Sequence, residues 1–182
     1  MRGKWPWFER PFTFDYPPEK FPDILERLRG TPVRVAALVR DVSKDVLTHR
    51  DDETWSIQEN VGHLADVEPL WMGRIDDMLA SAELMREADL TNAATFAAGH
   101  NDRTIGEVLA SLREVRGELV RRLESLSKAE VALASIHPRT KIRMRVCDLC
   151  TFVAEHDDYH LARITHLKRD FISRSEREPT SP

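Results

Sequence analysis

The chain has 182 residues, of which 41% are hydrophobic and 32% charged, and its formal net charge is -4. This composition excludes an intrinsically disordered chain and fits one well-buried domain. Basic residues are interspersed among acidic ones, which argues against a nucleic-acid partner, and no apolar run reaches the roughly 20 residues of a membrane span. Because no secretory signal is recognisable either, we expect a cytoplasmic protein without a membrane partner.

Residues 1–21 are rich in both aromatic side chains and proline. The prolines argue against a helix, and the aromatic side chains argue against a disordered tail. We therefore expect an extended arm that lies over the rest of the chain. The residues that carry this pattern are Trp5, Trp7, Phe8, Phe12, Phe14 and Tyr16, together with Pro6, Pro11, Pro17 and Pro18.

The segment after the arm predicts a short helical piece and then the first long helix. The short piece covers residues 23–29 and ends at Gly30. Thr31 is an expected N-cap, and Pro32 stands at the favoured first helical position, so the long helix should run from Pro32 into the mid-40s. Its apolar residues recur every three or four positions, as a core-facing stripe does: Val35, Leu38, Val39, Val42 and Val46.

Two capping boxes mark the starts of the next two long helices. The sequence SIQE at 56–59 places a glutamate three residues after an N-cap serine, and the sequence TIGE at 104–107 repeats this pattern. The first box predicts a helix from residue 57 into the mid-80s, with a kink at Pro69. The second predicts a helix over residues 105–126.

The last third of the chain contains one more long helix. Residues 127–130 predict a short helical turn, residues 136–145 are irregular, and the fourth long helix covers residues 146–171, before a polar tail at 172–182. Four amphipathic helices without a strand pattern predict an all-α four-helix bundle over residues 22–171. The long second connection leaves the order of the helices in the bundle open.

His156 and His160 lie one turn apart on the apolar face of the fourth helix. At about 100° per residue both imidazoles point into the bundle, close enough for two nitrogens to meet at one ion. Many helices carry such a pair by chance, and core or surface residues are the alternative. Burial of two neighbouring histidines nevertheless requires partners for their nitrogens, and a shared metal ion is one such partner.

A third ligand must come from another part of the chain. His63 lies beside the apolar stripe of the second helix, where it could face the fourth helix across the core. His49, His100 and His137 fall in predicted loops, where solvated side chains are expected. His166 completes the ligand spacing of a zinc-protease motif, but in a continuous helix it points about 120° away from the pair.

Three neutral imidazoles would leave a metal ion with positions open for water or substrate. Such an ion can lower the pKa of a bound water or thiol and so produce a nucleophile. Three imidazoles suit zinc, nickel, copper and iron alike, and we expect zinc or nickel. Asp157, Asp158 and Tyr159 flank the ligands and are candidates for supporting the ligands or for proton transfer. A solvated acidic face is the alternative for Asp158, and packing is the favoured role for Tyr159.

The two cysteines form a CxxC pattern at Cys147 and Cys150. No second CxxC and no strand-loop-helix context accompany it, so we expect small buried side chains, with redox sensing as the alternative. The tryptophans are expected in the core or as arm anchors. Trp55 and Trp71 bracket the segment that carries His63.

Two segments resemble those of a known family. WSIQENVGHLADVE at 55–68 and FVAEHDDYH at 152–160 look like the tryptophan-serine to histidine-leucine segment and the closing HxxxH helix of the DinB/YfiT-like superfamily. The similarity extends from about Pro22 to Lys168 and leaves the arm outside. It implies a four-helix bundle, often a homodimer, with a divalent metal held by three histidines, here His63, His156 and His160.

The resemblance implies less about the activity. Some members are metal-dependent thiol S-transferases or isomerases that use low-molecular-weight thiols such as bacillithiol, mycothiol or glutathione, and others are described as metal-dependent hydrolases. Our leading hypothesis is an enzyme that activates a thiol or water for attack on a small-molecule substrate. The alternative is a metal-binding or stress-response protein in which the ion ties the second and fourth helices together without catalysis.

Overall fold

The computed structural model describes residues 6–51 and 54–175, and its long helices form the predicted four-helix bundle. One of the four long segments is made of two consecutive helices. The segments are α1 (Phe21–Val39), α3 (Ile57–Asp66) with α4 (Glu68–Leu79), α6 (Ile105–Glu124) and α8 (Val146–Ser175). None of the helices in the described part of the chain is long and apolar enough to cross a membrane.

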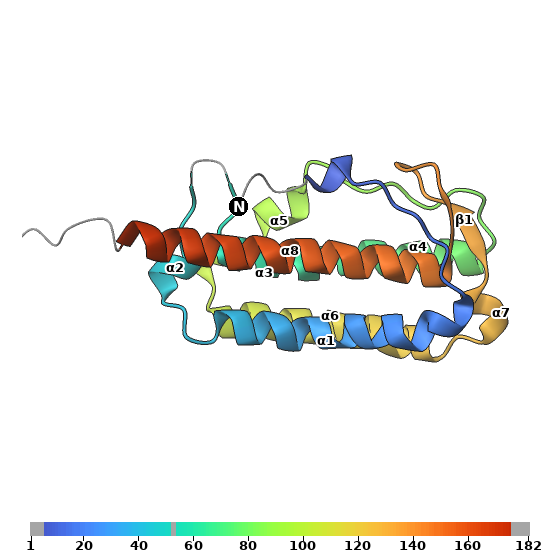
Figure 1. Cartoon of the computed structure of the whole chain (residues 1–182), viewed down its shortest axis with the longest axis horizontal. Helices are drawn as coiled ribbons and strands as arrows, with labels where there is room; N and C mark the ends of the chain where they lie inside the picture. Colours follow the sequence, from blue (N-terminus) through green and yellow to red (C-terminus); the bar gives the residue numbers. More distant parts are fainter. Residues whose placement is uncertain (1–5, 52–53, 176–182) are drawn as a thin grey trace, which may run out of the picture.

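Consecutive long helices are not neighbours throughout this bundle. α1 packs against α6 and α8, and α3 packs against the same two helices, so α1 and α3 lie on opposite corners. In Figure 1, α1 and α8 run in one direction along the long axis, while α3, α4 and α6 run in the other. The short helix α2 (Lys44–Thr48) lies in the connection that carries the chain from α1 to the start of α3. The chain therefore passes diagonally across the bundle from α1 to α3, and the helices do not follow a simple up-down-up-down order.

α1 is continuous where the sequence predicted two helices. It runs through Gly30 and Pro32, although proline has no N–H to donate to the carbonyl of Leu28 four residues earlier. Arg116 of α6 takes over this role, because its Nη1 donates to the Leu28 carbonyl oxygen at 3.1 Å. A side chain distant in sequence thus satisfies the carbonyl that the proline leaves unpaired, and the helix continues. The predicted break at Thr31 is wrong.

The second predicted helix divides near the expected kink. α3 ends at Asp66 and α4 begins at Glu68, so that Pro69 stands in the first turn of a new helix, where its missing N–H costs nothing. α4 ends at Leu79, earlier than the mid-80s expected from the apolar stripe. Both capping boxes are confirmed, and a third one starts α7 (Lys128–Val131).

Residues expected to be irregular form a small antiparallel hairpin. β1 (Ala134–Ile136) pairs with β2 (Arg143–Arg145), with Ser135 opposite Met144. The segment that follows α4 lies beside β1 at the edge of this hairpin, since the backbone N–H of Met85 donates to the carbonyl of Ile136 at 3.0 Å. Strands of three residues are too short to show a detectable alternation of apolar and polar residues in the sequence. The remaining elements are η1 (Trp7–Glu9), η2 (Pro18–Lys20), α5 (Ala93–Ala97) and η3 (His100–Asp102).

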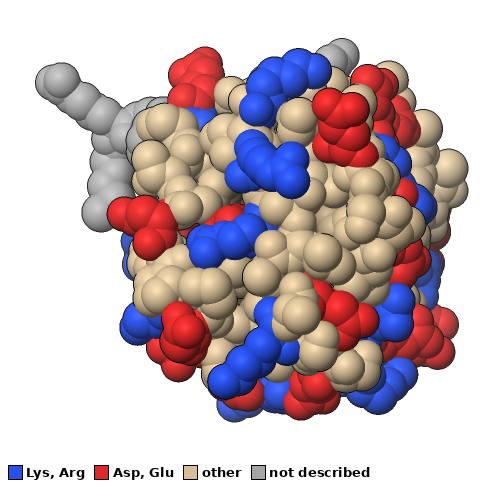
Figure 2. Space-filling view, turned by 90° about the vertical axis from the view of Figure 1, so that its right-hand side faces the viewer, with Lys and Arg blue, Asp and Glu red and all other residues tan. Residues whose placement is uncertain are grey.

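The arm lies on the bundle as expected, and the last helix is longer than expected. Residues 6–20 run along the outside of α8 to the start of α1 (Figure 1). Trp7 is buried against Phe152, and the carbonyl of Tyr16 accepts a hydrogen bond from Arg145 at 2.8 Å. α8 continues to Ser175, so the predicted polar tail begins as helix. The face in Figure 2 carries acidic and basic side chains side by side.

Two apolar clusters fill the bundle, one toward each end. On α8, the first cluster reaches Ala154 and the second begins at Leu161; on α6, the corresponding limits are Leu119 and Leu112. Between the two clusters the helices contribute polar side chains. A layer of buried polar groups therefore crosses the middle of the bundle: Thr31, His63, Glu68, Arg116, His156, Asp157 and His160.

Candidate metal centre

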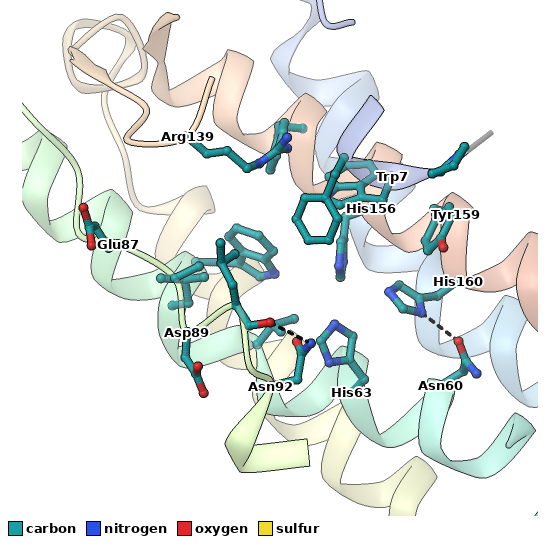
Figure 3. A pocket seen from close by; sticks show the side chains of 18 of the residues that line it. Trp7, Asn60, His63, Glu87, Asp89, Asn92, Arg139, His156, Tyr159 and His160 are labelled. Atoms are coloured by element: carbon teal, nitrogen blue, oxygen red, sulfur yellow. Dashed lines mark hydrogen bonds between the residues drawn. The ribbon is translucent and has the colours of Figure 1, made fainter. Parts of the chain in front are cut away.

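The three histidines of the predicted ligand set meet in this polar layer. His63 comes from α3, and His156 and His160 come from successive turns of α8. One nitrogen of each ring can be chosen so that all three lie within 4.8 Å of one another. The ring centroids are 4.6 to 5.3 Å apart, and each residue is at most 6% exposed. Figure 3 shows the rings pointing toward a common space.

A buried asparagine fixes the orientation of His160. The side-chain nitrogen of Asn60 donates to the carbonyls of Ser56 at 2.7 Å and Trp55 at 3.3 Å, so its oxygen must face the other way. That oxygen lies 2.9 Å from Nδ1 of His160, as Figure 3 shows. Nδ1 therefore carries the proton, and the lone pair of Nε2 is free for a ligand. Asn60 stands three residues before His63, a helical spacing that could have revealed it.

The other two rings have different surroundings. Nδ1 of His63 lies 3.0 Å from the hydroxyl of Thr95, which α5 brings to the site from the long second connection. Nδ1 of His156 is buried without a hydrogen-bond partner among the described residues, between the rings of Trp7 and Trp71. A buried polar atom without a partner costs about 1 to 3 kcal/mol. This orphaned nitrogen, together with the three neutral imidazoles, fits a divalent metal ion.

Burial keeps the three imidazoles neutral. It lowers the pKa of His63 to about 4, with a smaller contribution from His100 and an opposing one from Asp66. Burial also places the pKa values of His156 and His160 well below the ordinary value of 6.5, and neighbouring histidines lower them further. At neutral pH the site therefore offers lone pairs and no protons that a cation would have to displace.

The remaining histidines lie away from this cluster. His166 is exposed and its Nε2 lies 2.9 Å from Asp170, which agrees with its exclusion as a ligand. His49 is exposed, as expected. His100 and His137 are buried at 3% and 2% exposure, which corrects the expectation of solvated loop side chains. The reason is long-range packing, since the ring of His100 lies where a Cβ at Gly62 would be, and only glycine permits this approach.

Asp157 faces away from the histidines. Its carboxylate accepts hydrogen bonds from Thr31 at 2.7 Å and from both terminal nitrogens of Arg116 at 2.5 and 3.0 Å. Arg116 also pairs with Glu68, so this buried network ties α8 to α1, α4 and α6. Asp157 does not line the pocket described below. The structure thus places its carboxylate in a network that joins helices.

Tyr159 stays beside the site. Its ring centroid lies 5.1 Å from that of His160, and Cζ of Arg10 lies over the ring of Tyr159, 5.1 Å from its centroid. Asp158, by contrast, pairs at the surface with Arg27 and Arg34, as a solvated acidic face would.

The two cysteines belong to the core. Both thiols are free and buried, and burial raises the pKa of each above its ordinary value. Neither Cys147 nor Cys150 joins a cluster of metal-binding groups in residues 6–51 and 54–175. High pKa values disfavour the thiolate, so the structure supports small buried side chains over a redox pair.

The histidines open onto a pocket of about 690 Å³. Aromatic side chains form part of its walls: the ring of Trp55 lies 4.6 Å from that of His63, and Trp7 covers His156 from the arm. Its far end is basic and contains Arg74 and Arg139. A pocket of this size and composition suits a small molecule with an apolar body.

Comparisons with known proteins agree with this architecture. The solved structure of YfiT from Bacillus subtilis, described as a probable metal-dependent hydrolase with an unusual four-helix bundle topology, matches with a TM-score of 0.73 and 21% identity. The match covers 89% of this chain and 93% of YfiT. No curated protein matches in a comparison of sequences. The family model of the DinB superfamily matches residues 27–164, and the chain therefore belongs to the DinB superfamily.

Proposed function

We propose that the chain is a metal-dependent enzyme in which His63, His156 and His160 hold a divalent ion, zinc or nickel, next to the substrate pocket. The observation that carries the proposal is the convergence of three buried, neutral imidazoles at the wall of this pocket. When bound, the ion supplies a Lewis acid with positions left for a water or a low-molecular-weight thiol. Attack of that nucleophile on an electrophilic small molecule is the proposed reaction class.

The protein's own residues prepare the site for this chemistry. Asn60 holds the proton of His160 on Nδ1 and so directs Nε2 toward the ion. A hydrogen bond between Nδ1 of His63 and the hydroxyl of Thr95 restrains the orientation of the His63 ring. Trp7 packs against the ring of His156, while Tyr159 is a candidate for proton transfer at the pocket wall.

Two nucleophiles are compatible with this arrangement. Water would make the chain a hydrolase, the activity that the description of YfiT names for that protein. A thiol would make it an S-transferase, which the family resemblance supports. A homodimer and a cytoplasmic location belong to the same proposal, and the oligomeric state is tested by light scattering on the purified chain.

Turnover by the metal-loaded protein tests the proposal. The chain is loaded with zinc, nickel or manganese and assayed with a panel of thiols and electrophiles and with ester and amide substrates. His160→Ala should abolish turnover while the fold is retained. The matched control is His166→Ala, which removes an exposed histidine from the same helix and should leave turnover unchanged.

A structural ion would give a different result. In that case the metal raises the melting temperature by joining α3 to α8, and no member of the panel is turned over. Metal-dependent stability without turnover would therefore contradict the enzymatic proposal and support the alternative.

A further inference from the structure

The pocket extends from the histidines to a second group of polar side chains. Arg74 of α4 lines it, together with His137 and Arg139 from the turn between β1 and β2. One indole ring separates the two ends, since Trp71 lies 5.6 Å from the ring of His156 and 5.4 Å from Cζ of Arg74. In Figure 3, Arg139 reaches from the hairpin side toward Trp7, above the histidines.

Arg74 is a buried cation without a paired carboxylate. It is 2% exposed and makes no ion pair within the described residues. Its Nε donates to the carbonyl of Arg86 at 3.1 Å. The carboxylate that acts on it electrostatically, Asp77, is occupied by three hydrogen bonds from Arg86 at 2.7 to 2.9 Å. A buried charge in such a position is costly unless a counter-ion is present.

Arg139 is the second unpaired cation of this pocket end. Its guanidinium lies 5.2 Å from the ring of Phe8 and 5.9 Å from that of Phe152. In the part of the chain that the structure describes, the side chain makes no ion pair, and its Nη2 is buried without a hydrogen-bond partner. Ring contacts orient the group but do not satisfy its N–H donors.

The neighbours of Arg74 accept hydrogen bonds from it but carry no negative charge. Nε2 of His137 lies 2.9 Å from Nη1 of Arg74, and its Nδ1 faces the backbone N–H of Arg139 at 3.2 Å. Burial and both arginines lower the pKa of His137 to about 3, so it supplies no countercharge. Trp71 adds a further donor, because its Nε1 is buried without a partner among the described residues.

Neither acidic residue that lines the described pocket forms an ion pair with Arg74 or Arg139. Glu87 and Asp89 are exposed at its rim, and Asp89 accepts hydrogen bonds from Thr91 and the backbone N–H of Ala93. The basic end therefore combines two unpaired cations with unpartnered donors. Among the described residues, no anionic acceptor pairs with these two cations.

We propose that Arg74 and Arg139 bind the carboxylate or phosphate of a small acidic substrate, whose apolar body lies against Trp71 and Phe152 and whose reacting group reaches the three histidines. The substrate class is thus an acid with an aromatic or aliphatic body. The reaction at the histidines rests on the proposed function, whereas binding of the anionic group does not.

Calorimetric titration of the full chain tests this inference. The probes are phenylacetate and phenyl phosphate, which distinguish the two anions, and neutral phenylacetamide as the uncharged analogue. Each probe is titrated into zinc-loaded protein and into protein treated with a chelator. Arg139→Gln is the main variant because its side chain belongs to a surface turn, and Arg74→Gln is the second. The matched control is Arg163→Gln, which removes a charge from the same pocket near His160.

We expect at least one acid to bind both forms of the protein at least ten times more tightly than phenylacetamide. Arg139→Gln should weaken this binding about ten-fold or more, as the loss of a charge-assisted hydrogen bond does, and Arg163→Gln should weaken it less. Unchanged affinity in Arg139→Gln, a larger loss in Arg163→Gln, or equal binding of phenylacetamide would overturn the inference. Binding of acids only to zinc-loaded protein would place the anion on the ion and overturn it too. If instead acids bind as expected and zinc does not, the proposed function fails and this inference stands.

Discussion

Asn60 offers the sharpest test of how the site is organised. Its side-chain oxygen accepts the proton of His160 Nδ1 at 2.9 Å, and its nitrogen is bound to the carbonyls of Ser56 and Trp55. Asn60→Ala removes the acceptor without removing a ligand. His160 can then rotate or exchange tautomers, so that its Nε2 is no longer directed at the ion in every molecule.

The expected loss of metal affinity follows from the single hydrogen bond between Asn60 and His160. Removal of a partner that orients a ligating histidine typically lowers metal affinity about 10- to 100-fold, which corresponds to roughly 1.4 to 2.7 kcal/mol. Competition between the protein and a chromophoric zinc chelator measures this affinity directly. Asn60→Ala should still bind one zinc per chain, more weakly than the parent.

A neighbouring residue provides the matched control. Gln58 is a buried amide on the same helix, 1% exposed, and its side chain donates to the backbone carbonyls of His100 and Arg103. Gln58→Ala should lower the melting temperature and leave zinc affinity unchanged. Equal zinc affinity in Asn60→Ala and the parent chain would refute the reasoning, because the ligand would then need no orienting partner.

Two further predictions concern stability. The pKa of His63 is lowered to about 4 in the folded chain. As the pH falls, the unfolded chain therefore takes up a proton on His63 before the folded chain does. The contribution of His63 to the stability of the metal-free protein should therefore be complete above about pH 6.5. Up to roughly 3 kcal/mol of it should be lost as the pH falls toward 4, in addition to the losses from His156 and His160, whose pKa values are lowered as well. Urea unfolding across this range checks it, and an undiminished pH dependence in His63→Leu would contradict the assignment. Arg116→Met leaves Glu68 and Asp157 buried without a countercharge and should cost about 3 to 5 kcal/mol in thermal or urea unfolding. Arg122→Met, which removes only an exposed ion pair, should change stability by less than about 0.5 kcal/mol, and similar losses in the two variants would count against a buried network.

Local signals in the sequence were sufficient for much of the fold. A capping box depends on residues three positions apart, so the starts of α3 and α6 could be predicted from Ser56 and Thr104. The helical period likewise placed His156 and His160 on one buried face, and it separated them from the exposed His166.

Features that depend on distant partners could not be predicted in this way. Pro32 predicts a helix start unless a side chain such as Arg116 satisfies the carbonyl that the proline leaves free. His137 is buried because the hairpin folds it against Arg74, a contact across 63 positions of the chain. Thr95 reaches His63 from a connection without any periodic pattern. In each case the deciding contact is tertiary.

X-ray absorption at the zinc edge of the loaded protein tests the central claim most directly. The structure predicts one zinc per chain, with three imidazole nitrogens at about 2.0 to 2.1 Å and with oxygen or nitrogen, not sulfur, in any remaining position. His63→Ala should remove one imidazole from this shell. A sulfur neighbour at about 2.3 Å, or a shell unchanged by His63→Ala, would contradict the three-histidine site.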